Sequence, residues 1–236
     1  MSYPKIETLF NRSKEDFKVL EDSIRREEFL IPKYWQVTEK IDGTNIRIIF
    51  MRDCPVIIKG RTDRAQIPVF LKEYLQRVFT YSCLNNVFKD LDLNKKVIIY
   101  GEGYGTTINK KGKRIWIGRK YRSEGAGFRL FDIWIGPADA TSFKSGWWLK
   151  TKDRLDISSR LGVPHVPILS RKMTINEIVR FVKKEGLSPT SLLENGGCFM
   201  EGIVARTEPL LLMRNGERLM FKLKHSDFRR EENDSE

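Results

Sequence analysis

The sequence predicts an α+β fold in which mostly antiparallel sheets are flanked by helices. Short stretches rich in β-branched and aromatic residues recur along the chain, and glycine or polar turns separate them. A few longer segments instead repeat apolar residues at helical spacing. Hydrophobic residues make up 40% of the chain and aromatic residues 11%, which is enough to form a core. Because no linker or internal repeat interrupts the 236 residues, we expect a single domain.

Four segments show helical periodicity. Residues 14–30 carry apolar side chains near helical spacing and predict a surface helix that precedes the main sheet. A second helix is predicted from Pro68, because proline suits the first turn of a helix. Residues 151–162 predict a third helix. The fourth would begin at Thr174 and end at Gly186, following the usual start and stop signals.

Strands are predicted in most of the remaining apolar segments. Residues 37–51 are typical of a strand, a tight turn at DGTN and a second strand. Residues 95–105 predict a strand that ends in a glycine-rich bend. The tail over residues 229–236 is polar and is expected to fray. Further strands are predicted over 55–62, 114–118, 128–136, 198–206 and 218–224.

The charge balance favours a polyanionic partner. With a net charge of +12, the chain could bind a polyanion by neutralising its phosphates and releasing their counterions. Such a charge can also serve solubility alone. No apolar run is long enough for a membrane span, and the N-terminus does not resemble a signal peptide. The widely spaced Cys54, Cys83 and Cys198 fit a reducing cytosol, so a cytoplasmic location is expected. His165 and His225 are the only histidines, which leaves little material for a transition-metal site.

The first chemical motif is Lys40 followed by Ile-Asp-Gly-Thr-Asn. A lysine amine becomes a nucleophile when burial or nearby cations lower its pKa. A glycine in such a turn lets backbone N–H groups approach a phosphate. The alternative is a solvated lysine beside an ordinary turn.

Three more motifs carry charged groups at strand ends or on strand faces. Glu102 stands between glycines and could accept hydrogen bonds from a ribose hydroxyl. Glu201, before Gly202, could present its carboxylate to a metal ion or to an attacking amine. Lys222 and Lys224 alternate along a strand, which puts both on one face about 7 Å apart and suits a phosphate. Each motif alone is also compatible with an ordinary loop or solvated strand.

Together and in this order, the motifs resemble the catalytic domain of the covalent nucleotidyltransferases, the superfamily of polynucleotide ligases and mRNA capping enzymes. Within it the chain is most similar to the RNA ligases, especially phage double-strand RNA ligases and kinetoplastid editing ligases. Asn45 carries this distinction, because capping enzymes and DNA ligases typically have arginine there. Asp42 departs from the closest relatives, which often have histidine. The six matching motifs are EKIDGTN, KGRT, IIYGEGYG, FRLFDIWIG, EGIVAR and FKLK, within residues 39–224.

The resemblance implies an ATP-dependent RNA ligase. Lys40 would attack the α-phosphorus of ATP and become lysyl-AMP, the AMP would pass to an RNA 5′-phosphate, and a 3′-hydroxyl would displace it. Lys222 and Lys224 would hold the α-phosphate, and Glu201 would bind Mg²⁺ or Mn²⁺ near the lysine.

The resemblance also implies a set of nucleotide-binding residues. Glu102 would bind the ribose, Phe131 would stack on adenine, and Arg61 would contact phosphate or ribose. Glu39 and Asn45, which flank the nucleophile, would orient the nucleotide and metal.

Other readings remain open. The chain could be a DNA ligase, a capping-type guanylyltransferase, or a nucleic-acid-binding module without turnover. The sequence ends soon after Lys224, whereas resembling ligases carry an OB-fold or helical domain there, so no such domain is expected in this chain. RNA, with a nicked duplex as one candidate form, and ATP are the expected partners, with no membrane, and the oligomeric state is open.

Overall fold

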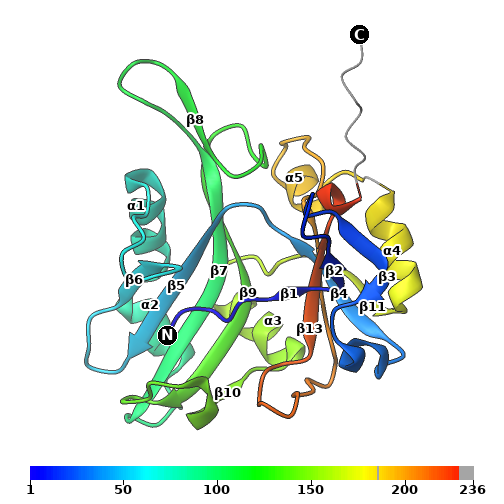
Figure 1. Ribbon diagram of the computed structural model, residues 1–236. Helices are drawn as coiled ribbons and strands as arrows, with labels where there is room; N and C mark the ends of the chain where they lie inside the picture. The colour runs from blue at the N-terminus through cyan, green and yellow to red at the C-terminus, as the bar shows by residue number, and fades with distance from the viewer. Residues whose placement is uncertain (185, 229–236) are drawn as a thin grey trace. The chain divides into compact units, whose positions relative to one another are not determined.

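The computed structural model describes residues 1–184 and 186–228 (Figure 1). These residues form two compact units. Unit 1 contains residues 1–4, 42–166 and 190–198. Unit 2 contains the described residues of the ranges 5–41, 167–189 and 199–228. A single domain over 1–236 stays a prediction. The tail predicted to fray lies outside the described residues.

Unit 1 is built on a six-stranded antiparallel sheet. Its strand order is β10-β9-β7-β5-β6, and β8 pairs with the far end of β7. The long strands β7 and β9 form the centre, so their alternating side chains decide what each face presents. The strands are β5 (Thr44–Met51), β6 (Ile57–Gly60), β7 (Lys95–Ile108), β8 (Arg114–Ile117), β9 (Gly125–Pro137) and β10 (Trp147–Trp148).

Helices cover the apolar face of this sheet. As predicted, α1 (Val69–Val78) follows Pro68, and it buries Leu71 and Leu75. Figure 1 shows α1 and α2 (Tyr81–Val87) beside β5 and β6, and the core beneath them is continuous. The predicted third helix is α3 (Thr151–Arg160), which packs on β9. Unit 1 also holds η2 (Phe143–Ser145) and most of α5 (Pro189–Leu193).

Unit 2 contains a five-stranded sheet in the order β1-β13-β12-β4-β11, antiparallel except for the parallel pair β1 and β13. Its apolar face includes Trp35, Val37, Ile203 and Phe221. The strands are β1 (Glu7–Thr8), β4 (Trp35–Lys40), β11 (Ile168–Met173), β12 (Gly202–Arg206) and β13 (Met220–Lys224).

The predicted fourth helix is α4 (Ile175–Lys183), and it begins with the expected cap. Thr174 accepts from the backbone N–H of Glu177, and Glu177 accepts from the Thr174 backbone in return. The helix ends before Gly186, with Lys184 as its last capping residue. Unit 2 also has a short hairpin of β2 (Phe10–Arg12) and β3 (Val19–Ile24), and the 3₁₀ helices η1 (Glu27–Leu30) and η3 (His225–Asp227).

The α+β fold class with mostly antiparallel sheets is confirmed, but the predicted N-terminal helix over 14–30 is wrong. Residues 19–24 instead form β3, in which Ile24 pairs opposite Phe10 and Leu20 opposite Asn11. Phe17, which completed the helical spacing, is 71% exposed at a turn with φ of 58°. The segment therefore pairs with β2 as a strand, although its apolar residues are spaced as in a helix.

Two strand predictions also need correction. The segments on either side of DGTN are strands, but they do not form a hairpin, because β4 belongs to the sheet of unit 2 and β5 to that of unit 1. The glycine-rich bend expected after residue 100 is absent from this segment, and β7 runs straight through it. Its glycines serve packing: a Cβ at Gly101 would lie 2.1 Å from the Phe128 ring, and one at Gly103 would lie 2.7 Å from Leu71.

Candidate functional site

In unit 2, the sheet places Lys40 and Lys224 in one row. Gly202 of β12 pairs with Lys40 of β4 on one side and with Lys224 of β13 on the other. Lys222 lies one row further along β13, opposite Val204. Because side chains two residues apart share a face of a strand, Lys222 and Lys224 lie on the same face, as predicted.

Glu201 joins the two lysines of that row. Its Oε2 lies 2.5 Å from the Lys40 Nζ, and its Oε1 lies 2.7 Å from the Lys224 Nζ. The carboxylate side chain is only 8% exposed. Burial alone would raise the pKa of Glu201, but the charges and hydrogen bonds of Lys40 and Lys224 outweigh it and hold that pKa below its usual value. The predicted proximity of Glu201 to the lysine amine is therefore present.

Lys222 is the cation of this group without a fixed partner. Its Nζ has no hydrogen bond or ion pair among the residues that the structure describes. Burial lowers the pKa of Lys222, and the nearby charges of Lys40 and Lys224 lower it further. Such a cation is positioned to meet a phosphate that the protein itself does not supply.

Gly202 allows this crowding because it has no side chain. A Cβ there would lie 2.1 Å from the Leu223 carbonyl oxygen and 2.7 Å from the Lys224 Cα. The Glu-Gly step of the motif thus lets β12 lie close to β13 while Glu201, one residue earlier, reaches both lysines.

Glu39 lies on the opposite face of β4 from Lys40. Its carboxylate is 2% exposed and accepts a hydrogen bond from the Ser188 hydroxyl. Its backbone N–H donates to the Pro167 carbonyl at 2.9 Å. The structure therefore does not bring the Glu39 side chain into the lysine cluster, and these bonds fix the end of β4 instead.

In unit 1, Asn45 and Glu102 form a second row. Asn45 of β5 pairs with Glu102 of β7, and Glu102 pairs with Arg129 of β9. The Asn45 Oδ1 is buried and lacks a hydrogen-bond partner within the described part of the chain. Buried amide oxygens normally have a partner, so this atom marks a place where a ligand or water would bind.

The turn between Lys40 and Asn45 is held by backbone packing. A Cβ at Gly43 would lie 2.4 Å from the Gly103 carbonyl oxygen. The Asp42 N–H donates to the Tyr121 hydroxyl at 2.8 Å, and the Asp42 carbonyl accepts from the Arg119 N–H at 3.4 Å. The glycine predicted to face a phosphate thus brings the turn against β7.

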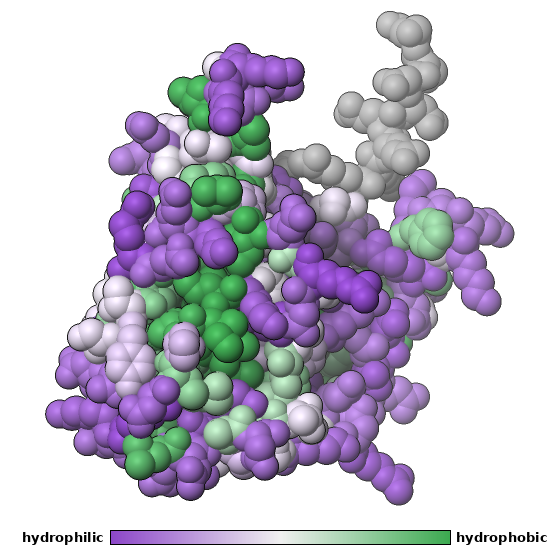
Figure 2. Space-filling model, turned by 90° about the vertical axis from the view of Figure 1, so that its left-hand side faces the viewer, coloured by the Kyte–Doolittle hydropathy of each residue, from purple (hydrophilic) through white to green (hydrophobic). Residues whose placement is uncertain are grey.

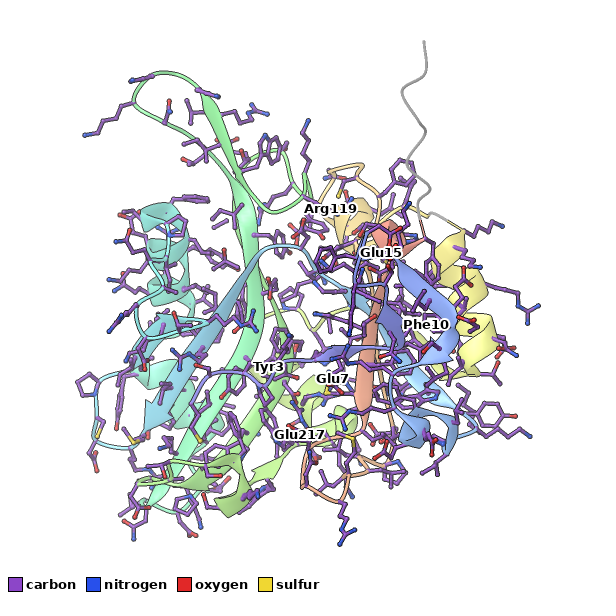
Figure 3. The ribbon with its side chains drawn as sticks, viewed as in Figure 1. Tyr3, Glu7, Phe10, Glu15, Arg119 and Glu217 are labelled. Carbon is purple, nitrogen blue, oxygen red and sulfur yellow. The ribbon has the colours of Figure 1, made fainter. Side chains whose placement is uncertain are left out.

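Phe131 stands at a bulge of β9. The partner of Tyr100 is Asp132, but that of the next residue is Leu130, so Phe131 is the extra residue. Bulges often redirect a side chain next to an active site. Here the Phe131 ring meets the ring of Tyr3 edge-on, with centroids 4.9 Å apart. Figure 3 shows Tyr3 on the N-terminal segment before β1.

Tyr3 is fixed by a buried polar chain. Its hydroxyl donates to Asp132 at 2.8 Å, and Asp132 pairs with Arg154 of α3 at 3.2 Å. Asp132 is fully buried and Arg154 is 2% exposed. Tyr3 could not be found from the sequence, since nothing near it repeats or matches a motif.

Two arginines of unit 1, Arg61 and Arg47, lie in different environments. Arg61 is exposed in the turn after β6, with no hydrogen bond or ion pair to the described residues. Arg47 is instead buried in β5, where it donates to the Gly60 carbonyl at 2.8 Å and pairs with Asp63 at 3.1 Å. Its place two residues after Asn45 puts both on one face of β5, a signal that strand alternation offered.

The predicted site residues therefore fall into two sets. Unit 2 brings together Lys40, Glu201, Lys222 and Lys224, and unit 1 brings together Asn45 and Glu102. No group of three or more potential His, Cys, Asp or Glu metal ligands occurs in the described ranges. Mg²⁺ and Mn²⁺ do not require one, because they commonly bind one or two carboxylates plus water and substrate phosphates. Glu201 fits that kind of site.

Several large side chains outside these two sets contribute to packing. Trp134 and Met200 are buried, and Trp148 belongs to an aromatic group with Tyr3 and Tyr100. Trp147 is 49% exposed. Across the described residues, none of the helices has the length and apolar character needed to span a bilayer.

Comparison with solved structures finds the same fold in RNA ligase from Naegleria gruberi. A lysine-to-alanine mutant with ATP and Mn is 19% identical, with a TM-score of 0.55, covering 95% of this chain and 62% of that one. An arginine-to-alanine mutant with ATP and Mn is 20% identical, with a TM-score of 0.58, covering 96% and 59%. A lysine-to-methionine mutant with AMP and Mn is 20% identical, with a TM-score of 0.54, covering 94% and 62%.

This chain thus spans about three fifths of the length of those ligases. A comparison with curated proteins found no match. The family described as RNA ligase matches residues 33–224, which include all six motifs. The chain therefore belongs to the RNA ligase family.

Proposed function

We propose that this protein is an ATP-dependent RNA ligase that joins 3′-hydroxyl and 5′-phosphate ends through lysyl-AMP. The observation that carries this proposal is the cluster in unit 2, where Glu201 lies between Lys40 and Lys224 and Lys222 stands beside them. A cluster of three lysines with one buried carboxylate is costly in a fold, because like charges repel. A phosphate bound there would relieve the repulsion.

In the first step, the Lys40 Nζ attacks the α-phosphorus of ATP. The N–P bond forms, the bond from the α-phosphorus to the bridging oxygen breaks, and pyrophosphate leaves with the electron pair. The attacking amine loses a proton, for which Glu201 Oε2 is within reach. Lys222 and Lys224 would neutralise the negative charge on the phosphoryl oxygens.

A divalent ion would bind Glu201 together with phosphate oxygens and water, and it would supply further charge neutralisation at the phosphate. Binding of ATP at this site also gives Lys40 and Lys224 new anionic partners. Glu201 thus orients the lysines before the nucleotide arrives and is released from them as the phosphate is bound.

The nucleoside roles are assigned to unit 1. Glu102 would bind the ribose, Phe131 would stack on the adenine, and the unpartnered oxygen of Asn45 would accept a hydrogen bond from the nucleotide or from metal-bound water. Arg61, which is exposed and forms no ion pair with the described residues, is free to reach a phosphate. Glu39 acts by fixing the strand end that carries Lys40.

In the later steps, an oxygen of the RNA 5′-phosphate attacks the phosphorus of lysyl-AMP, and the N–P bond breaks. The 3′-hydroxyl then attacks the 5′-phosphorus, loses its proton and releases AMP. We expect RNA ends, such as those at a nick in a duplex, as the physiological substrate, in the cytoplasm.

The decisive test is covalent labelling. The protein is incubated with α-labelled ATP and Mg²⁺ or Mn²⁺, and the label is followed on a denaturing gel. Lys40→Ala should abolish the label, whereas Lys172→Ala, an exposed lysine of β11 in the same sheet, should retain it. A folded wild-type protein that takes no label refutes the proposal.

The alternative functions are distinguished by the labelling assay together with assays of end sealing and strand binding. Labelling by GTP in preference to ATP indicates a capping-type guanylyltransferase. ATP labelling with sealing of DNA ends but not RNA ends indicates a DNA ligase. Strand binding without any adduct indicates a binding module without turnover.

A further inference from the structure

The strongest unassigned feature is the projecting end of β7 and β8 with the loop after it, residues 105–122, here called the hairpin arm. Figure 1 shows it extending beyond the rest of the unit 1 sheet. It lies within residues 33–224, which match the RNA ligase family, and none of its charged side chains belongs to the lysine cluster of unit 2. Its pairing is regular, with Gly105 opposite Ile117 and Ile108 opposite Arg114.

The hairpin arm concentrates positive charge. Between Glu102 and Glu124 the sequence contains no acidic residue. Among the described residues, only Arg119 and Arg122 have acidic partners, at 3.8 Å from Asp42 and 3.4 Å from Glu194. The other cations form no ion pair with described residues and are exposed: Lys110, Lys111, Lys113, Arg114 and Lys120.

The tip of the arm is ordered by its own hydrogen bonds. The Asn109 side chain accepts from the backbone N–H groups of Lys111 and Lys113, at 3.0 and 2.9 Å. The Asn109 N–H donates to the Lys113 carbonyl, and the Gly112 N–H donates to the Asn109 carbonyl, both at 2.9 Å. The lysines are therefore presented on a fixed turn, which reduces the entropy lost when a partner binds.

An aromatic residue stands among these cations. The Arg114 guanidinium and the Lys120 ammonium each lie 5.8 Å from the centre of the Trp116 ring. Such contacts hold long cationic side chains against a rigid surface. Figure 2 shows mostly hydrophilic surface around the projecting end of the molecule, with a smaller hydrophobic area beside it. Basic side chains combined with aromatic ones are typical of surfaces that bind nucleic-acid strands.

The base of the arm rests on the loop that follows the nucleophile. Gly118, with φ of 71°, approaches so closely that a Cβ would lie 1.8 Å from the Asp42 carbonyl oxygen. Tyr121 and Arg119 hold the Asp42 backbone, and Figure 3 labels Arg119 in this loop. Asp42 follows Lys40 by two residues, so their Cα atoms lie within about 7 Å. The base of the arm is therefore packed against the Asp42 turn within unit 1.

From these observations we infer that the hairpin arm binds the sugar–phosphate backbone of the RNA that the ligase joins, an inference that rests on the proposed function. Lys110, Lys111 and Lys113 neutralise phosphates at the tip. Arg114 and Lys120, held on Trp116, do so nearer the base. These contacts position the strand without reading its sequence.

The test compares two triple variants with equal charge loss. In the arm variant, Lys110, Lys111 and Lys113 are replaced by glutamine. In the control variant, Lys144, Lys150 and Lys152 of the same unit, which are exposed and form no ion pair with the described residues, are replaced by glutamine. Binding of a labelled, 5′-phosphorylated single-stranded RNA is followed by fluorescence anisotropy over a range of salt concentrations.

The arm variant should bind RNA about tenfold or more weakly at low salt. The slope of log K against log salt should fall by about 2, since each lost phosphate contact removes roughly 0.7. The control variant should change both values much less. Equal losses in the two variants, or no loss in the arm variant, overturn the inference. So does an arm variant that keeps RNA binding but no longer binds vesicles of anionic lipid, which would assign the arm to membranes.

Adenylate labelling separates this inference from the proposed function. The arm residues do not belong to the lysine cluster, so the arm variant should take the ATP label as the wild type does, which also shows that it is folded. If the wild type takes no label but loses RNA binding in the arm variant, the ligase proposal fails and the RNA surface stands. If the arm variant is labelled normally and binds RNA as the wild type does, the ligase proposal stands and the inference about the arm fails.

Discussion

Lys222 should lower the stability of the folded protein, although it is needed for the proposed adenylation. Burial and the charges of Lys40 and Lys224 lower the pKa of Lys222, and Glu201 offsets only part of that effect. Replacing Lys222 with methionine, which has a similar length and no charge, should therefore stabilise the protein. The same change should reduce adenylation about 100-fold or more, because a cation directed at the phosphate is lost.

The magnitude follows from the strand geometry. Lys40 and Lys224 contribute two positive charges and Glu201 one negative charge, which leaves a net repulsion of one charge on Lys222. Residues two apart on a strand are separated by about 7 Å. At that separation one unit charge costs about 2 kcal/mol at an effective dielectric constant near 20, and about 0.6 kcal/mol in bulk water. A gain of about 0.5–2 kcal/mol raises the melting temperature by about 1–8 °C.

The pH dependence supplies a second readout. Because the pKa of Lys222 is lower in the folded protein than in the unfolded chain, the charged form is disfavoured on folding. That penalty is fully present below the folded pKa and disappears as pH rises toward the unfolded value near 10.5. The stability advantage of Lys222→Met should therefore be largest at neutral pH and shrink as the solution becomes alkaline.

Thermal melts between neutral and alkaline pH, together with the labelling assay, measure both effects. Lys172→Met on β11 is the matched control, and it should change stability by less than about 0.5 kcal/mol and leave labelling intact. A lower melting temperature for Lys222→Met at neutral pH would show that this lysine stabilises the sheet. An advantage that grows with pH would contradict the charge argument.

Further substitutions test the supporting structure. Arg154→Met should lower the free energy of unfolding by about 3–5 kcal/mol, measured by urea denaturation, because Asp132 is left buried without its ion-pair partner. Gly202→Ala should reduce adenylation far more than Gly112→Ala, since the first Cβ would lie 2.1 Å from a carbonyl oxygen and the second meets no atom within 4 Å. Tyr3→Leu should raise the KM for ATP with a smaller change in kcat, because Tyr3 contacts the ring proposed to stack on adenine; Tyr3→Phe should largely restore it.

Strand alternation predicted part of the lysine cluster from the sequence. Lys222 and Lys224 share a face because they are two residues apart in a strand, and this required no knowledge of the neighbours. The position of Glu201 between Lys40 and Lys224 could not be deduced in that way. It depends on β12 lying between β4 and β13, a long-range pairing that local pattern does not encode.

The local sequence pattern led to wrong predictions where the same pattern is compatible with two different structures. β-branched residues around DGTN fit a hairpin, yet β4 and β5 enter different sheets. Residues 14–30 fit a helix, yet β3 pairs with β2. The bulge at Phe131 likewise has no local signal, because FRLFD reads as a regular strand and only the register with β7 shows the extra residue.

The motif glycines show that family signatures encode backbone approach as much as chemistry. Gly43 faces the carbonyl of Gly103, and Gly202 faces the carbonyl of Leu223, so in each motif a side chain would push the neighbouring strand away. Gly43 follows Lys40 by three residues, and Gly202 follows Glu201 directly. A charged group can be held within ion-pair distance of another only when the strands that carry them are fixed. The glycines therefore help to hold the charged groups in place. Replacing them should displace the lysines even though no charge is removed.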